Sequence, residues 1–353
     1  MDIDNHQRFS DIDTHHMLSH IDGLPDQLIN AWMLGMKQEL PEFRNYRQMI
    51  VAGMGGSAIS ADLLCAYIEP ICQIPLQVHR DYSLPAWANG PETLAIISSH
   101  SGDTEETLSA FDQAIANRCT TVVISTGGQL SRKASQVCIP LWQYNYPIQP
   151  RAAVGYSFGF MLSILTRLNI IPNPSDELQD ASITMKTAQK HLKAEVQAIN
   201  NPAKRIAGQM VGRLPVVIGY GILAPVARRW KAQINEIAKT WSQYDLIPEG
   251  NHNTLAGIEN PEKITPNIYA LFLRIPTDRS RNQQRITLTQ KKFMLQGLGT
   301  DFIEARGNTP LAQIWSTLHF GDYVAYYLAM FYGQDPTSIP TINDFKTRMS
   351  APG

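Results

Sequence analysis

The sequence predicts an α/β protein with two tandem, doubly wound domains, each a parallel sheet flanked by helices. Two observations carry this prediction. Short apolar runs, too short to be helices, alternate along the chain with segments whose apolar residues recur at helical spacing. The alternation begins near residue 48 and starts again near residue 215, so the same arrangement is expected twice.

Length and composition fit two globular domains that handle a small molecule. The 353 residues exceed one ordinary core, and 44% of them are hydrophobic. Thirty Lys and Arg nearly balance thirty-one Asp and Glu, which favours neither nucleic acid nor a membrane surface as partner. The four cysteines form no CxxC pair, the first residues are acidic, and no apolar run approaches ~18 residues. We therefore expect a cytoplasmic protein with reduced thiols.

The first strand is expected at 48–52, where it runs into the glycine-rich turn GMGGSA at 53–58 and then a helix to about residue 68. The turn satisfies the dinucleotide fingerprint GxGxxA, so a nicotinamide- or flavin-dependent oxidoreductase is one alternative. That fingerprint also needs an acidic residue roughly 20 positions on, at the end of the next strand. Here Asp81 follows Gly53 by 28 positions, which makes the match weak.

A hydroxyl-rich loop, SSHSGDTEE at 98–106, follows the apolar run at 94–97 and precedes a helical pattern. Gly102 permits a sharp turn, while the hydroxyls of Ser99, Ser101 and Thr104 gather where the N–H groups of the new helix point. This arrangement predicts a phosphate site. The alternative is an ordinary helix cap, because Ser or Thr followed by Glu also begins helices without any ligand.

The rest of the first half adds strands at 76–78 and 121–124 and an irregular segment, rich in aromatics and proline, at 142–150. Arg151 comes directly after that segment and before a helix expected from about residue 154. This position suits contact with an anion or hydroxyl, although a surface charge is the simpler interpretation. Residues 173–210 are polar and helix-prone, so we divide the chain into domains at 1–172 and 211–353 joined by this helical connector.

The second half repeats the first. Residues 215–224 align with 49–58, which places Gly219 on Gly53 and Gly221 on Gly55, and later strands are expected at 269–275 and 301–305. No hydroxyl-rich loop corresponds to 98–106, so the second domain is free to supply other groups.

The helix expected at 225–240 supplies a carboxylate. Its apolar face is predicted to carry Val226, Trp230, Ile234, Ile237 and Trp241. Arg229, Gln233 and Glu236 share another face, and a salt bridge to Lys239 would give Glu236 a purely structural role.

Past that helix, His252 lies between two asparagines in the loop at 248–254, where a structural role is also possible. Phosphate loop, carboxylate and imidazole are together the groups needed to open a sugar ring and move a proton between adjacent carbons.

Five segments together resemble the bifunctional phosphoglucose/phosphomannose isomerases, a family of the sugar isomerase superfamily whose domains are called SIS domains. They are the turn at 51–58, the loop at 98–106, QINE at 233–236, NHN at 251–253 and GDYVAYYLA at 321–329. The resemblance covers nearly the whole chain. It implies two tandem SIS-type domains and an aldose-ketose isomerase that interconverts glucose 6-phosphate, mannose 6-phosphate or both with fructose 6-phosphate through a cis-enediol.

The resemblance also implies roles for single residues. Glu236 would be the base between C1 and C2, Arg151 would stabilise the enediolate, and His252 and Lys346 would assist ring opening. A homodimer is implied, with His252 reaching the neighbouring subunit's site, and neither a cofactor nor a metal is required. One departure is Thr254, where the family tends to have a glutamate. The phosphate and sugar would be bound by Ser99, Ser101, Thr104, Gly55, Gly56 and Ser57.

A different class of function stays open. A non-catalytic sugar-phosphate sensor would use the same loop for recognition, but it would not need Glu236, His252 and Arg151 together.

Overall fold

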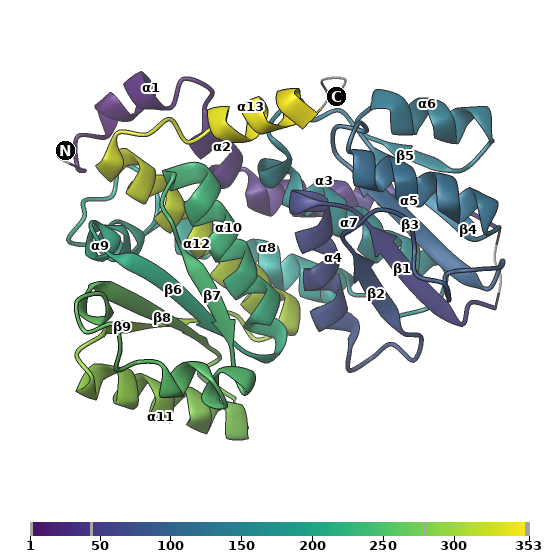
Figure 1. Cartoon of the computed structure of the whole chain (residues 1–353). Helices are drawn as coiled ribbons and strands as arrows, with labels where there is room; N and C mark the ends of the chain where they lie inside the picture. The colour runs from purple at the N-terminus through teal and green to yellow at the C-terminus, as the bar shows by residue number, and fades with distance from the viewer. Residues whose placement is uncertain (1–2, 43–44, 279, 350–353) are drawn as a thin grey trace.

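The structure, a computed structural model, describes residues 3–42, 45–278 and 280–349. It contains two parallel sheets, with α4 (Gly55–Ile68) and α10 (Ala224–Ala238) packed against each other between them (Figure 1). The predicted α/β class with two doubly wound domains is confirmed. The outermost residues of the predicted domains, 1–2 and 350–353, lie outside the described residues.

The first sheet has the strand order β2-β1-β3-β4-β5, with every neighbouring pair parallel. Pairing of Ala52 with Ile97 brings the glycine turn after β1 beside the hydroxyl loop after β3. Four strands match the predicted apolar runs, whereas β5 forms where an irregular segment was expected. The elements are β1 (Gln48–Ala52), β2 (Leu76–His79), β3 (Thr93–Ser99), β4 (Thr120–Ser125), β5 (Leu141–Gln143), α5 (Glu105–Ala116), α6 (Gly128–Gln136), η2 (Pro150–Ala153) and α7 (Val154–Arg167).

The second sheet has the order β7-β6-β8-β9, which repeats the order of the first four strands of the first sheet. The predicted equivalence of the glycine turns is also confirmed in backbone geometry, because Gly55 and Gly221 adopt φ values of +48° and +51°. The elements are β6 (Leu214–Gly219), η3 (Gly221–Leu223), β7 (Gln243–Leu246), η4 (Glu249–Asn251), η5 (Thr254–Ala256), η6 (Thr265–Asn267), β8 (Ile268–Arg274), α11 (Arg281–Leu295) and β9 (Gly299–Glu304).

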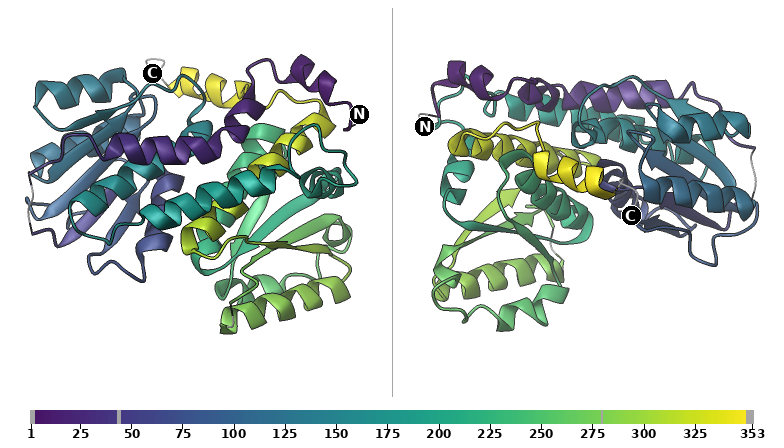
Figure 2. Two further views of the ribbon diagram at one scale, coloured as in Figure 1. Left: turned by 180° about the vertical axis from the view of Figure 1, so that it is seen from behind. Right: turned by 45° about the horizontal axis from the view of Figure 1, so that its top comes forward.

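The remaining helices surround and join the two sheets (Figure 2). The long α12 packs on α10, α8 and α9, and α8 also packs on α3, so the segment interpreted as a connector forms a layer shared by both halves. Thr309 caps the amino end of α12, and Gly333, with φ +63°, ends it. These helices are η1 (His6–Arg8), α1 (Phe9–Ile12), α2 (Met17–Asp22), α3 (Leu24–Gly35), α8 (Ser175–Gln189), α9 (Pro202–Met210), α12 (Pro310–Tyr332) and α13 (Pro340–Met349).

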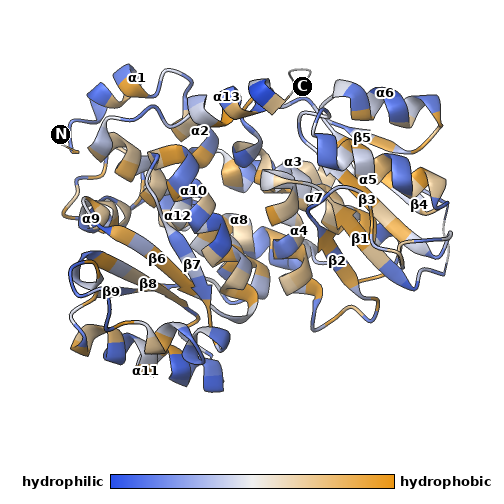
Figure 3. Ribbon diagram, viewed as in Figure 1, coloured by the Kyte–Doolittle hydropathy of each residue, from blue (hydrophilic) through white to orange (hydrophobic). Residues whose placement is uncertain are grey.

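Apolar residues are concentrated in the strands of both sheets (Figure 3). The strands β1, β3 and β4 are almost completely buried, as expected for a parallel sheet covered on both faces. Within the described part of the chain, no helix combines the length and apolar character needed to span a membrane.

Candidate active site

The hydroxyl loop folds as strand, tight turn and helix start. Gly102 has φ +73°, and a Cβ at this position would lie 1.9 Å from the Gly127 carbonyl oxygen, so only glycine fits. The buried Ser99 Oγ accepts a hydrogen bond from the Gly102 amide at 3.1 Å and lies 3.1 Å from Thr104 Oγ1. Thr104 is the N-cap residue of α5, but its side chain makes no capping hydrogen bond. The backbone N–H groups at the amino end of α5 therefore have no side-chain cap, and these hydroxyls surround them. Such an arrangement can bind an anion.

Ser101 completes the loop on its exposed side, where its Oγ accepts the Asp103 amide at 3.2 Å. His100 was not singled out in the sequence analysis, and its imidazole holds the loop in place. Its ring nitrogens lie 3.0 Å from the Tyr144 hydroxyl and 2.8 Å from the Ile148 carbonyl oxygen. Burial lowers the pKa of this imidazole, so the neutral ring ties the loop to the segment that leads to Arg151.

The glycine turn after β1 allows two close backbone approaches. A Cβ on Gly53 would lie 2.7 Å from the Ser98 carbonyl oxygen, and one on Gly56 would lie 2.6 Å from the Pro150 carbonyl oxygen. Ser57, in the first turn of α4, is buried. The hydroxyl loop thus packs closely on Gly53, and the turn η2, which carries Arg151, packs closely on Gly56. At both points of closest approach, glycine allows the contact because it has no Cβ.

Arg151 and Glu236, expected from separate halves of the chain, meet between the domains. Arg151 Nη1 lies 3.5 Å from Glu236 Oε2, with the Arg151 side chain 3% exposed and the Glu236 side chain 30% exposed. Within the described part of the chain, Lys239 forms no ion pair with Glu236 that would give the carboxylate a purely structural role; its ammonium donates instead to the carbonyls of Ile237 and Asp335. Glu236 is therefore paired with a cation across the domain boundary and still reaches solvent.

Backbone carbonyls from the carboxyl-terminal segment hold the Arg151 guanidinium. Its Nη2 donates to the Pro336 carbonyl at 2.8 Å and to the Thr337 carbonyl. Burial lowers the pKa of Arg151, and the Glu236 charge opposes that shift. Arg151 Nε has no hydrogen-bond partner among the described residues. Buried polar atoms without a partner are uncommon, and a functional role is one explanation for them.

A buried network on α10 and α12 supports Arg151 from the other side. Arg229 Nη2 donates to the Arg151 carbonyl at 2.7 Å and to Asp322 Oδ2 at 3.0 Å, and Gln233 Nε2 donates to Asp322 Oδ1 at 2.9 Å. Arg229 and Gln233 were expected to share one helix face with Glu236; both are buried, because α12 packs on this helix. Asp322 lies in the predicted motif at 321–329, but nothing in the sequence indicated its partners.

A cavity of about 360 Å³ opens beside Glu236, at the carboxyl end of α10. It is lined by this helix end and by the chain that links α12 to α13. Trp241, expected on the apolar face of the helix, lines the cavity and is 70% exposed because α10 ends at Ala238. The lining residues are Asn235, Glu236, Lys239, Thr240, Trp241, Gln334, Asp335, Ser338, Ile339, Pro340, Thr341 and Ile342.

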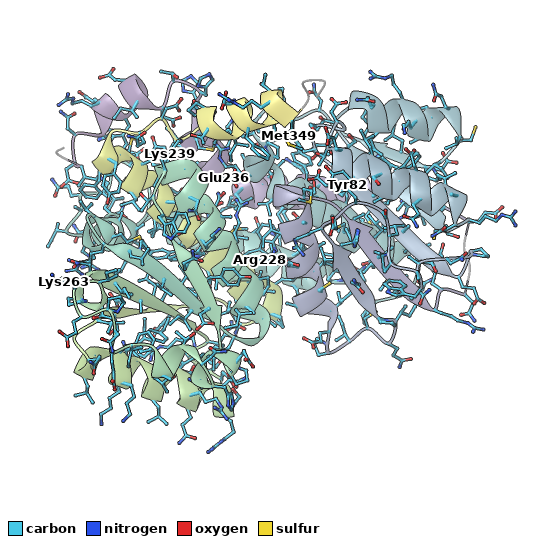
Figure 4. The ribbon with its side chains drawn as sticks, in the orientation of Figure 1. Tyr82, Arg228, Glu236, Lys239, Lys263 and Met349 are labelled. Atoms are coloured by element: carbon cyan, nitrogen blue, oxygen red, sulfur yellow. The ribbon has the colours of Figure 1, made fainter. Side chains whose placement is uncertain are left out.

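The structure does not bring His252 to Glu236 within one chain. The Ile247 amide donates to the Gly219 carbonyl at 2.9 Å, so the loop at 248–254 starts beside the amino end of α10. Glu236 is twelve residues further along that helix, about 18 Å at 1.5 Å per residue. Figure 4 labels Arg228 near one end of α10 and Glu236 near the other. Asn251 fixes the loop to α11 through Thr289 at 2.7 Å, while the His252 side chain is exposed.

Lys346 lies on α13, and its side chain is exposed. The cavity is lined by α13 only as far as Ile342, so Lys346 is not among the residues around Glu236. No three His, Cys, Asp or Glu side chains gather as a metal-binding group in the described ranges.

The comparisons with known proteins agree with this architecture. Residues 199–349 match the family model described as the bacterial phospho-glucose isomerase C-terminal SIS domain. The C-terminal domain of the glucosamine-fructose-6-phosphate aminotransferase from Francisella tularensis has a similar fold, with a TM-score of 0.72, 14% identity, and 94% of this chain and 99% of that chain covered. Fold and family model together define a protein of the sugar isomerase (SIS) class.

Curated relatives narrow the class. The bifunctional phosphoglucose/phosphomannose isomerase of Caldicellulosiruptor bescii is 34% identical, with 95% of this chain and 99% of that protein covered. The protein of the same name from Aquifex aeolicus is 32% identical, with 86% and 91% covered. The chain therefore belongs to the family of bifunctional phosphoglucose/phosphomannose isomerases, as the sequence motifs predicted.

Proposed function

We propose that the protein interconverts glucose 6-phosphate, mannose 6-phosphate or both with fructose 6-phosphate through a cis-enediol, with Glu236 as the base. The observation that carries this proposal is the position of Glu236 Oε2, 3.5 Å from the buried Arg151 and beside an open cavity. A carboxylate that accepts a proton beside a fixed cation has the chemistry of enolisation next to a carbonyl. The names of the curated relatives support the same pair of substrates.

The two ends of the substrate are assigned to different domains. Ser99, Ser101 and Thr104 bind the phosphate at the amino end of α5, while the sugar chain runs past Gly55, Gly56 and Ser57. Glu236 removes the proton from C2 of the open-chain aldose and returns it to C1. The positive charge of Arg151 stabilises the enediolate oxygen that forms in between. The reaction transfers hydrogen within one molecule, so by its own electron balance it needs no redox cofactor.

Ring opening must precede this step, because the substrates are cyclic hemiacetals. We assign it to His252 with Lys346 as a second candidate. The exposed His252 loop, which starts at the opposite end of α10 from Glu236, supports a homodimer in which His252 serves the neighbouring subunit's site. The role of Lys346 has less support, since its side chain lies outside the cavity beside Glu236.

The proposal is tested by Glu236→Gln with assays of both epimers. The amide keeps the size of the side chain but cannot accept the proton, so kcat should fall about 10²- to 10⁴-fold for every substrate that the wild type uses. Binding of fructose 6-phosphate, measured by calorimetry, should remain. Glu262→Gln, an exposed carboxylate in the loop before β8, is the matched control and should behave as wild type. Near-normal turnover in Glu236→Gln would show that Glu236 is not the base.

The non-catalytic sensor makes a different prediction for the same samples. It would bind sugar phosphate without converting either epimer, and Glu236→Gln would then change affinity only. Wild-type turnover of one epimer is sufficient to reject it.

A further inference from the structure

Lys239 ends α10 three residues after Glu236, in a conformation that few lysines adopt. Its φ is +53°, in the left-handed region that normally selects glycine, and its amide still donates to the Ile234 carbonyl as the helix ends. Its side chain lines the same cavity as Glu236. Figure 4 labels both residues at the same end of α10. Glycine would form this helix end more easily, so the lysine side chain itself needs an explanation.

The Lys239 ammonium donates a hydrogen bond to the carbonyl of Asp335, which also lines the cavity. Asp335 begins the turn that holds Arg151. Its carboxylate accepts the Thr337 amide at 2.8 Å and the Ser338 amide at 3.3 Å, which fixes the fold of the turn. The next two carbonyls, of Pro336 and Thr337, both accept from Arg151 Nη2. A single turn therefore connects Lys239 to Arg151.

We propose that Lys239 is a positioning residue that ties the turn at 335–337 to the end of α10 and thereby holds the Arg151 guanidinium toward Glu236 and the substrate. The proposal rests on the catalytic role given to Arg151 above. The charged groups that face the ammonium come from three elements: Glu236 on α10, Arg151 on η2, and Asp335 after α12.

These surroundings also determine the pH range in which the Lys239 side chain is charged. Desolvation and the nearby Arg151 lower the pKa of Lys239 to about 8, although Asp335 and Glu236 oppose the shift. The ammonium is therefore charged at neutral pH and loses its proton as the pH rises through about 8. Without the charge the hydrogen bond to the Asp335 carbonyl weakens, and the turn is released.

The test uses Lys239→Met, Lys239→Gly and Lys239→Arg, with Lys231→Met on the same helix as control. Steady-state kinetics should show kcat about 10- to 100-fold lower in the Met and Gly variants, with KM little changed, because Arg151 is misplaced while the phosphate loop is intact. Glycine relieves the left-handed backbone, so a loss in Lys239→Gly cannot be ascribed to a damaged helix end. Wild-type kcat should fall above pH 8, the Met variant should lack this limb, and the Arg variant should shift it to higher pH.

Hydrogen exchange of the amides in 334–342 provides a readout that is independent of activity. Exchange should be faster in the Met and Gly variants than in wild type and in Lys231→Met. Unchanged exchange in Lys239→Met would show that Lys239 does not hold the turn at 335–337. Faster exchange with an unchanged kcat and pH profile would show that holding this turn does not position Arg151. Failure of the proposed function is recognised separately, by full turnover in Glu236→Gln.

Discussion

Arg151 shows how much of the site depends on single residues that are remote in sequence. Its place between an irregular segment and a helix start predicted contact with an anion or hydroxyl. The structure gives its side chain a carboxylate from Glu236 and two carbonyls from Pro336 and Thr337, while the Arg229 guanidinium donates to its backbone carbonyl. The two carbonyl acceptors could not be predicted, because a backbone oxygen has no sequence signature and these lie 185 and 186 positions away.

The hydroxyl loop yields a prediction at the same scale. Ser99 accepts the Gly102 amide and so shapes the turn, whereas Ser101 and Thr104 are more accessible. Ser101→Ala combined with Thr104→Ala should raise KM for fructose 6-phosphate about 100-fold or more, with a smaller change in kcat, because each of the two lost hydrogen bonds to a charged phosphate contributes ~1.5–3 kcal/mol. Steady-state kinetics measure this directly. Ser135→Ala, an exposed hydroxyl on α6, is the control, and an unchanged KM in the double variant would remove the phosphate role.

Among the elements, the buried strands and the edge strands β2 and β9 were predictable, whereas the edge strands β5 and β7 were not. The runs that became β1, β3, β4, β6 and β8 are apolar because helices cover both faces of the sheets. The short strands β5 and β7 are at sheet edges, where one missing neighbour leaves polar residues tolerable and weakens the apolar signal. The burial of Arg229 and Gln233 was likewise not predictable, since only the packing of α12 shows that Asp322 accepts a hydrogen bond from each of them.

The crossing of α10 and α12 depends on Gly321. A Cβ at this position would lie 2.1 Å from the Trp230 indole nitrogen, which is buried and donates to the Thr317 carbonyl at 2.9 Å. Gly321→Ala should therefore force the helices apart and lower the free energy of unfolding by about 1–3 kcal/mol, despite the better helix propensity of alanine. Denaturant unfolding followed by circular dichroism measures the loss.

Gly208 in α9 is the matched control for this substitution. A Cβ there would meet Phe331 at 3.5 Å, an ordinary van der Waals contact. Gly208→Ala should thus stabilise the protein by about 0.5–1 kcal/mol through helix propensity alone. If both variants were stabilised, close packing at Gly321 would not limit the approach of the two helices.

On the scale of the whole molecule, duplication explains why the proposed site takes its groups from both domains. Both sheets keep the same order and the same glycine turn, but only the first carries the hydroxyl loop. The second contributes Glu236 from the far end of the helix that follows its turn, where η2 of the first domain meets it. Phosphate binding and proton transfer are thereby assigned to different halves, and α13 lies across the side where the halves meet (Figure 1).

The same geometry makes the proposed dimer testable by mixing two inactive variants. Glu236→Gln lacks the base, and His252→Ala should lose most of its activity because ring opening is no longer assisted. If His252 acts in the neighbouring site, a mixed dimer contains one site with both groups intact. Co-expression at equal levels should then restore activity to about one quarter of wild type, since half of randomly paired dimers are mixed and each has one complete site. If each site were built from one chain, every site would lack a group and the mixture would be no more active than its components.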